Sequence, residues 1–567
     1  MLTADGWHGQ AAIAEDDQDS NGIDACRPGR VRFCHSVILL TQRGNIMSLL
    51  INVKDPVYGA MGDGVTNDTQ AFIAASAAIN AQGGGTLYIP PGVYIVGEQT
   101  FAGQAGRGYA YSCKDIIYIH DCDLPVVIQG EQAVLKAAPG LKFGSFDPVT
   151  GDSYEPASMP FTDPDYAAST YRMIVVANNR QVVIRDLELD GQSDTIVLGG
   201  GWGDLGRQLN AYGVYSFNSQ NLRVENVHTH HHGLDGVMVL QVGTTADSPR
   251  TPATLINVRS EYNARQGLSW CGGNGLTAID CQFNHTGRGG FFSSPAAGID
   301  IEASDGVIRN GLFINCEIIN NVGVGFLADT GDSADITLQR CTLIGSTNYP
   351  IWPRKPRIHF MDCTIAGQIV NTCGEQTPGN GHATRFTGCY LTDQITYNNQ
   401  VHMYPGWYLL DLGGGSLGVS LDHCTIHTGI GALMYTGGQV ILHSCNLIQT
   451  TTYTCSIEAL FSGQSKVQTA GVFGNSGLLV IGRLLCNGQE MASYQGPQWR
   501  LYLQSNNGSA TGSRQTQGYA YDPSAFTGVD SALQGDIIYN TAAVAGGYAG
   551  WICVGAGQWK PFGAIAS

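Results

Sequence analysis

The sequence predicts an all-β protein built as a parallel β-helix, in which short strands stack turn upon turn. Three observations lead to this prediction. Glycine is abundant, at 76 of 567 residues, and only 13% of the residues are charged, a mix that is typical of short strands joined by tight turns. A cysteine recurs in one local frame at short intervals. No helical pattern separates these recurrences, so consecutive turns can pair directly.

Seven cysteines define the repeat. In each, an apolar residue follows the thiol by two positions, and the steps between the thiols are 35, 25, 22, 26, 35 and 21 residues. A minimum of about 22 residues allows three strands and three bends per turn. Alternation places the thiol and the apolar residue on one face, so we expect the cysteines to stack inside the coil as small hydrophobic groups, without disulfides or metal. They are Cys281, Cys316, Cys341, Cys363, Cys389, Cys424 and Cys445.

The segment before the repeats predicts a helix that caps the open end of the coil. Asn67, with Gln70 three residues later, has the pattern of a capping box, and Gly83 can end the helix in a left-handed turn. The helix expected over 71–82 has one apolar stripe, which would cover the first turn and protect its edge. The stripe consists of Phe72, Ala75, Ser76 and Ile79.

The run from Asp55 to Tyr94 resembles the opening of the pectate-lyase-like superfamily of right-handed β-helix proteins. The matching residues are Gly62-Asp-Gly-Val-Thr-Asn-Asp-Thr69 and Gly83-Gly-Gly-Thr-Leu-Tyr-Ile-Pro-Pro-Gly-Val-Tyr94. This superfamily includes rhamnogalacturonase-like and polygalacturonase-like enzymes, alginate epimerases and bacteriophage tailspike depolymerases, and the chain is most like the last group. The resemblance implies a right-handed coil, and the repeats extend it to about residue 460.

The composition of successive segments divides the chain into five parts. Residues 1–46 are polar and patternless, and we expect a non-native or disordered leader before Met47. The N-terminal cap and first turns are expected over 47–100, the coil over 101–470 and a β-rich connector over 471–528. Residues 529–567 are predicted to form a small β module, similar to C-terminal pieces of phage tail proteins, that caps the chain or closes a trimer.

Charge and hydropathy exclude several classes of function. The chain has 46 acidic and 29 basic residues, a net charge of −17, which disfavours a surface for nucleic acid. No apolar run reaches the ~18–20 residues that span a bilayer, and no recognisable signal peptide is present. We expect a polysaccharide partner. The tailspike resemblance implies a homotrimer, located outside the cell or on a virion tail.

Two carboxylates on one strand are the predicted catalytic residues. In Gly298-Ile-Asp-Ile-Glu302, alternation directs the two isoleucines inward and both Asp300 and Glu302 outward. They are separated by roughly 6.6 Å along the strand, which permits both the ~5–5.5 Å of retaining and the ~6.5–9.5 Å of inverting glycosidases. Two like charges so close raise one pKa, as an acid–base pair requires. A solvated strand face is the alternative.

Two further residues are predicted to bind substrate beside this pair. Arg288 lies in an insertion just before the strand of Asp300, and insertions in solenoids often form the binding face. Its guanidinium could pair with an acidic sugar. Ser269 would lie beside Asp300 if Gly267 aligns with Gly298 on the neighbouring turn.

The run from His228 to Asp235 contains four histidines and an aspartate. It lacks a convincing fourth ligand from elsewhere, so no metal is assigned to it. His231 and Asp235 are predicted to contact sugar, with a solvated bend as the alternative. The run from Asp329 to Asp335 resembles an oxygen-rich calcium loop but matches no complete motif, and we expect no cofactor, with calcium as the alternative.

The predicted function is cleavage of glycosidic bonds in a bacterial capsular or extracellular polysaccharide, by a hydrolase on a tailspike-like scaffold. The Tyr-Gly-Phe-Asp-Pro-His-Glu site of alginate epimerases is absent, and Gly381-His382 lacks the partners it has in polygalacturonases. A polysaccharide lyase, a non-catalytic carbohydrate-binding tail fibre and a structural virion protein are the alternatives, since the fold alone does not decide among them.

Overall fold

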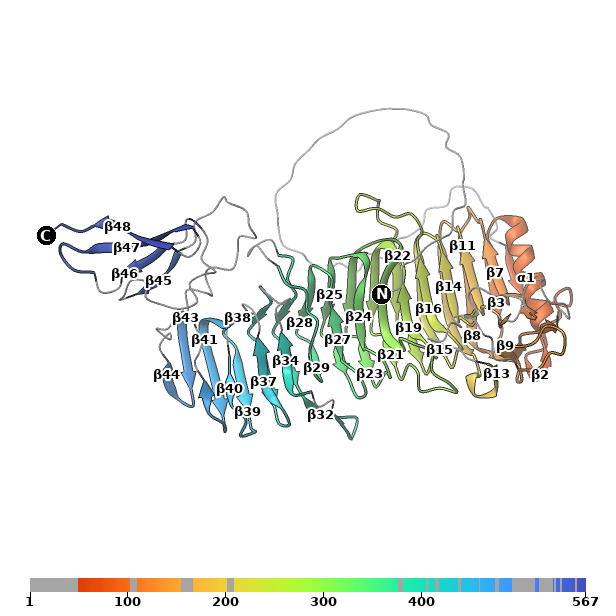
Figure 1. Ribbon diagram of the computed structural model, residues 1–567. Helices are drawn as coiled ribbons and strands as arrows, with labels where there is room; N and C mark the ends of the chain where they lie inside the picture. The colour runs from red at the N-terminus through yellow and green to blue at the C-terminus, as the bar shows by residue number, and fades with distance from the viewer. Residues whose placement is uncertain are drawn as a thin grey trace, which may run out of the picture. The chain divides into compact units, whose positions relative to one another are not determined.

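A computed structural model describes residues 49–566 except 102–109, 154–166, 201–208, 376–380, 404–405, 413–417, 437–439, 458, 475–478, 492–514, 520–533, 535–536, 541–542 and 556–557. The described residues form a parallel β-helix, whose successive turns Figure 1 shows side by side. Each turn contributes three strands. Within the described residues, no helix has the length and apolar character needed to cross a bilayer.

The three strands of each turn form three faces, which we call sheets I, II and III. Sheet I contains β7 (Ile117–His120), β11 (Ile174–Ala177), β14 (Val214–Phe217), β16 (Asp235–Leu240), β19 (Gln266–Trp270), the first part of β22 (Ala297–Ile314), β24 (Phe326–Ser333) and β27 (Ile351–Pro353). These strands pair in parallel, so one residue from each turn stands in register with the next.

Sheets II and III arise where longer strands bend around a corner of the coil. Sheet II contains β3 (Gly85–Ile89), the first parts of β8 (Val126–Ala137), β12 (Val182–Asp190) and β15 (Leu222–His230), then β17 (Ala253–Ile256), β20 (Gly273–Ile279), the last part of β22, β25 (Ile336–Gln339), β28 (Ile358–Met361), β30 (Arg385–Thr387), β35 (Ser420–Asp422) and β38 (Val440–His443). Sheet III contains β4 (Gly92–Val96), the last parts of β8, β12 and β15, then β18 (Arg259–Glu261), β21 (Gln282–Asn284), β23 (Glu317–Ile319), β26 (Thr342–Ile344), β29 (Thr364–Ala366), β31 (Tyr390–Thr392), β36 (Thr425–Thr428) and β39 (Asn446–Gln449).

A single residue in the left-handed conformation makes the corner between sheets II and III. It directly precedes each cysteine of the repeat, and its φ lies between 51° and 65°. Such a φ suits glycine, and asparagine and aspartate adopt it more readily than most other residues. The corner residues are Asp280, Asn315, Arg340, Asp362, Gly388, His423 and Ser444.

The seven cysteines of the repeat line the interior of the coil, as predicted. Each is at most 2% exposed and none is in a disulfide. Their thiols donate to backbone carbonyls, as from Cys363 Sγ to the oxygen of Leu338 on the preceding turn at 3.3 Å. Together with the inward aliphatic residues they form one continuous core along the described coil.

The N-terminal helix α1 (Thr69–Gln82) contacts β3 and β7, and Figure 1 shows it beside the first turns. Its predicted apolar stripe is buried, and Phe72, Ala75 and Ile79 belong to the core of the coil. Gly83 ends the helix with φ 70°, as predicted.

The predicted capping box at the start of α1 is wrong. The N-cap is Asp68, without a side-chain hydrogen bond to the helix. Its carboxylate instead accepts from the backbone N–H groups of Met61 and Gly62 at 2.7 and 3.0 Å. Gln70 points away and donates to Glu98 at 2.7 Å. The loop before the helix therefore uses the carboxylate that would otherwise cap it.

A second apolar cluster lies outside the coil, against the outer face of sheet I. It contains Met238 and Leu240 from sheet I, Cys271 directly after β19, and residues from the inserted segments such as Phe143 and Phe291. A side sheet of β5 (Gln99–Phe101), β6 (Tyr111–Cys113), β10 (Ala167–Ala168), β9 (Lys142–Ser145) and β13 (Val197–Gly199) accompanies it. Residues that point outward from this part of sheet I are therefore covered.

Towards the C-terminus, β41 (Ala459–Thr469) pairs in parallel with β43 (Leu479–Cys486), so stacked strands continue past residue 470. A separate four-stranded sheet consists of β45 (Gln515–Tyr519), β46 (Ile537–Asn540), β47 (Tyr548–Gly555) and β48 (Gln558–Ala564). The predicted leader, residues 1–46, and most of the predicted connector lie outside the described residues. The five-part division of the chain stays a prediction.

Replacing Cys341 by alanine removes a buried sulfur from the middle of the cysteine row and leaves a cavity. We expect the stability to urea to fall by about 1–2 kcal/mol. Cys373 is only half-buried and lies outside the row, so Cys373→Ala is the matched control, with an expected loss below about 0.5 kcal/mol. Equal losses in the two variants would contradict a structural role for the row.

Candidate functional site

The two predicted catalytic carboxylates lie on β22, on the side of the strand away from the core. Ile299 and Ile301 are fully buried in the coil, as alternation predicted. Asp300 is nevertheless only 5% exposed, whereas Glu302 is half-buried. The outward direction was predicted correctly. The alternative of a solvated strand face does not hold for Asp300, because inserted segments pack over this part of sheet I.

Asp300 is held by the neighbouring turn. Gln266 donates from Nε2 to Asp300 Oδ2 at 2.6 Å, and its Oε1 accepts from the backbone of Ala297. Ser269 pairs in register with Asp300, so the predicted alignment of the two turns is correct. The Ser269 side chain is fully buried, with its hydroxyl 3.4 Å from Cys271 Sγ. It therefore supports the strand of Asp300 from within a covered face.

A buried ion pair lies next to these carboxylates. Arg265 donates from Nε and Nη2 to the two oxygens of Asp235, at 2.7 and 2.5 Å. Both residues are buried. Asp235, predicted to contact sugar, is therefore engaged by a guanidinium inside the protein. Arg265 was missed by the sequence analysis; a lone arginine beside a strand has no pattern that marks it, and only the stacking of turns brings it here.

The surroundings of Asp300 and Glu302 favour the protonated form of each carboxyl group. Burial raises the pKa of Asp300 well above its ordinary value, the Glu302 carboxylate raises it further, and Arg265 opposes both effects. Burial also raises the pKa of Glu302, again opposed by Arg265. Within the described residues, Glu302 has no hydrogen bond or ion pair. The pair thus combines a buried proton donor with a partly exposed, unengaged carboxyl group.

Two tyrosines extend the site along sheet I and were also missed. The rings of Tyr212 and Tyr215 lie 5.1 Å apart, and charges near Tyr212 include Arg265. Tyr215 pairs with Met238, which in turn pairs with Ser269, so it lies in the row of Asp300. The guanidinium of Arg172 stacks on the Tyr215 ring at 4.7 Å. The sequence contains both tyrosines in the run Tyr212-Gly-Val-Tyr215, and this pair of phenols near one strand could have indicated the site.

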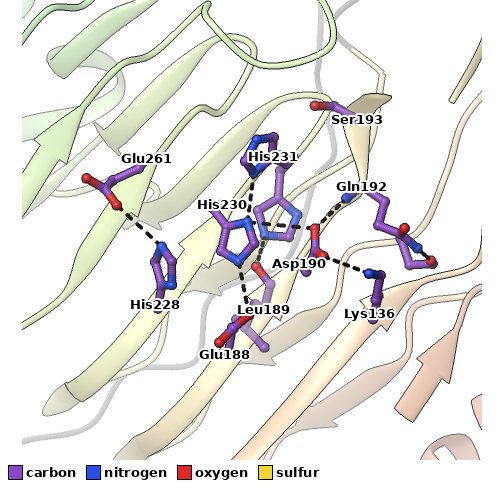
Figure 2. A network of polar contacts seen from close by, with 12 residues as sticks. Lys136, Glu188, Leu189, Asp190, Gln192, Ser193, His228, His230, His231 and Glu261 are labelled. Atoms are coloured by element: carbon purple, nitrogen blue, oxygen red, sulfur yellow. Dashed lines mark hydrogen bonds and ion pairs between the residues drawn. The ribbon is translucent and has the colours of Figure 1, made fainter. Parts of the chain in front are cut away.

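Two predicted substrate residues lie at bends of the coil, and no contact of either with the carboxylate pair is found in the described part of the chain. The exposed Arg288 donates to the backbone oxygen of Asn320 at 2.7 Å and to Thr347 at 3.2 Å. His231 stacks on Tyr262, with ring centroids 5.1 Å apart, and its Nδ1 lies 2.8 Å from that of His230. Figure 2 shows it among the polar residues of sheet III.

The run proposed for calcium is engaged by arginines. Asp332 accepts from Arg309 at 2.8 Å, and Asp335 accepts from Arg357 at 2.5 and 2.9 Å. Arg357 lowers the pKa of Asp335. These carboxylates already have cationic partners, so the residues fit a calcium loop poorly.

Comparisons with known proteins agree with the fold. Residues 50–104 match the family "Rhamnogalacturonase A/epimerase, pectate lyase-like", and residues 172–355 match "Right handed beta helix region". Mannuronan C5-epimerase AlgE6 of Azotobacter vinelandii is 31% identical over 218 residues, 35% of this chain and 21% of that protein. The chain therefore spans about a fifth of that relative's length.

Two of the solved structures that match parts of the chain are an epimerase module and a phage tailspike. The A-module of mannuronan C-5 epimerase AlgE4 from Azotobacter vinelandii matches with a TM-score of 0.37 and 20% identity, covering 68% of this chain and 99% of that one. Tailspike gp49 of Acinetobacter baumannii bacteriophage Fri1, a capsular polysaccharide depolymerase, matches with a TM-score of 0.32 and 11% identity, covering 80% and 66%. The two family matches confirm the predicted resemblance to pectate-lyase-like right-handed β-helix proteins.

The raised pKa of Asp300 predicts a pH-dependent stability. A carboxyl group whose pKa rises on folding stabilises the folded state below its unfolded pKa, and this contribution is lost as the pH rises through the folded-state pKa. Between pH 4 and 8, we expect the melting temperature of the wild type to fall relative to that of Asp300→Asn by about 2 °C or more. Asp305→Asn, at an exposed position of the same strand, is the control and should follow the wild type. Parallel curves for all three proteins would refute the assignment.

Proposed function

We propose that the protein cleaves glycosidic bonds of a bacterial capsular or extracellular polysaccharide by hydrolysis, with Asp300 and Glu302 as the catalytic pair. One observation carries the proposal: in two adjacent outward carboxyl groups, burial raises the pKa of both, and the Glu302 carboxylate raises that of Asp300 further. Glycosidases use such a pair, one carboxylic acid as proton donor and one carboxylate as base or nucleophile.

The surroundings assign a role to each member of the pair. Asp300, the more buried, keeps its proton and would donate it to the glycosidic oxygen. The anion left behind would be stabilised by the Gln266 N–H group and by the nearby positive charge of Arg265. Glu302, which is half-buried and makes no polar contact within the described residues, would act on the sugar or on a water molecule.

The ion pair with Asp235 positions Arg265 for this role. A bidentate pair fixes the plane of the guanidinium, and burial on both sides leaves its charge little screened by water. Asp235 would therefore act through Arg265, without touching the substrate. This gives it a function different from the sugar contact predicted from the sequence.

The substrate class and setting rest on similarity. The resemblance to a mannuronan epimerase supports a polysaccharide substrate. The same proposal includes a tailspike-like setting, in which the protein is a homotrimer on a virion or outside the cell. It also includes the absence of a nucleic-acid partner, which the net charge of −17 supports.

A polysaccharide lyase or epimerase acting on a uronate is the second candidate. The names of the curated relatives favour it, since they include mannuronan C5-epimerases and alginate lyase 7, which is 44% identical over 68 residues. Tyr212, Tyr215 and Arg265 would supply phenols and a cation on the face that bears Asp300. Burial raises the pKa of Tyr212, however, which makes it a poor base.

The experiment offers the protein a panel of capsular polysaccharides, exopolysaccharides and polyuronates, and follows reducing ends together with the ultraviolet absorbance of unsaturated uronates. We expect reducing ends without the absorbance, lowered at least about 100-fold in Asp300→Asn and in Glu302→Gln. Asp305→Asn should retain activity. Circular dichroism of each variant checks that the coil is intact.

Other outcomes decide between the alternatives. Ultraviolet absorbance would establish a lyase, and a changed ratio of epimeric uronates without cleavage would establish an epimerase. Cleavage that survives both substitutions would contradict the assignment of Asp300 and Glu302 as the catalytic pair. Binding of a polysaccharide without any chemical change would favour a tail fibre.

A further inference from the structure

A second cluster of chemistry-bearing residues lies on sheet III, on turns of the coil that precede the turn of the carboxylate pair. β15 presents His228 and His230 outward, since Val227 and Thr229 between and beside them are buried. The preceding turn places Glu188 opposite His228 and Asp190 opposite His230. Figure 2 shows these four side chains gathered on one face.

Three of these side chains converge as ligands of one ion would. One ligand atom from each of Glu188, His228 and His230 lies within 4.8 Å of the other two. Ligand atoms around a tetrahedral zinc ion, bound at about 2.0–2.2 Å, are about 3.3–3.5 Å apart. Glu188 Oε1 and His230 Nε2 are already 3.4 Å apart. Small side-chain rotations would bring the third ligand to the same spacing.

The surroundings orient His230 as a metal ligand. With Nε2 directed at Glu188, its other nitrogen, Nδ1, lies 2.8 Å from His231 Nδ1 and 3.7 Å from Asp190 Oδ1. Metal-bound histidines commonly donate this second N–H to a carboxylate or another acceptor, which sets the tautomer. Asp190 is itself held by Lys136, at 3.6 Å.

The two imidazoles lie close enough to bind the same ion. The rings of His228 and His230 are 4.2 Å apart and inclined by 35°. One cation could therefore take one nitrogen from each ring together with an oxygen of the Glu188 carboxylate. Glu261, on the following turn, lies 3.4 Å from His228 Nε2 and also pairs with Arg259 at 2.7 Å, so it can orient the His228 ring.

Beside the cluster is a pocket of about 360 Å³, and Glu188 and His228 are among its lining residues. Arg259 and Asn257 line it as well. Three protein ligands beside an open pocket are the arrangement in which a metal keeps one position for water or another small ligand. Imidazole and carboxylate ligands suit zinc and its first-row neighbours.

We propose that Glu188, His228 and His230 bind a divalent transition-metal ion such as Zn²⁺, with an open coordination position next to the pocket on sheet III. Asp190 and His231 are positioning residues that fix the tautomer of His230. The sequence analysis assigned no metal here because the histidine run lacked further ligands; the turn before it supplies them. This site is independent of the proposed hydrolysis at Asp300 and Glu302.

A second histidine cluster provides an internal comparison. Asp422 and His443 at the end of sheet II and the corner residue His423 also have ligand atoms within 4.8 Å of one another, but both histidines are exposed. His443 Nδ1 is 2.9 Å from Ser462 Oγ. Exposed side chains lose more rotamer freedom on binding a metal, so we expect this cluster to bind Zn²⁺ more weakly.

The test uses the full chain, stripped of metal with a chelator that is then removed, and titrated with Zn²⁺ by calorimetry and with Co²⁺ by visible absorbance. We expect one tight equivalent, with the absorption of a nitrogen- and oxygen-bound Co²⁺. Glu188→Gln and His228→Ala should each weaken it by at least about 100-fold, and Asp190→Asn by about 10-fold. His443→Ala, the matched control, should retain it.

The remaining outcomes overturn the proposal. A tight equivalent lost in His443→Ala but kept in His228→Ala would place the metal on sheet II. Binding unaffected by any of the variants would mean adventitious sites, and the absence of a tight equivalent in the wild type would mean that the cluster binds no metal. The melting temperature with and without Zn²⁺ gives a second readout for each variant, since a ligand that binds the folded state alone raises it.

Discussion

Hydrogen bonds between successive turns hold the strands of sheets I, II and III in register with the strands of neighbouring turns. A parallel ladder leaves no freedom to shift by one residue, because such a slip would exchange the buried and outward faces. Rows of equivalent residues therefore run along the coil. The buried cysteines form one such row, and the left-handed corner residues before them form another.

The same register builds both candidate sites from residues far apart in the sequence. Ser269 meets Asp300 on sheet I, and Glu188 meets His228 on sheet III. Each site needs only a short motif on one turn, either two outward carboxylates or two outward histidines. The neighbouring turns then supply the partners. In a solenoid, the residues of one site thus come from several neighbouring turns. Each turn by itself supplies the apolar residues that it buries in the core.

Burial separates the two sites electrostatically. Inserted segments pack over sheet I and exclude water from Asp300 and from the ion pair of Arg265 with Asp235. Burial there raises the pKa of both carboxyl groups, and charges interact strongly because little water screens them. Sheet III bears no such apolar cover over Glu188 and His228 in the described residues, where a pocket reaches them. The first environment suits proton transfer, and the second suits a hydrated metal ion.

The amino-acid sequence by itself determined the coil, the buried cysteine row, the inward isoleucines beside Asp300 and the position of the capping helix. These features follow from local alternation, from turn residues and from a repeat length, all of which a single turn contains. Tertiary structure decided the N-cap of α1, the burial of Asp300, the partner of Asp235 and the carboxylates that face His228 and His230. Each of these depends on a residue from another turn or an inserted segment, and no local pattern reports which distant side chain the register will place beside it.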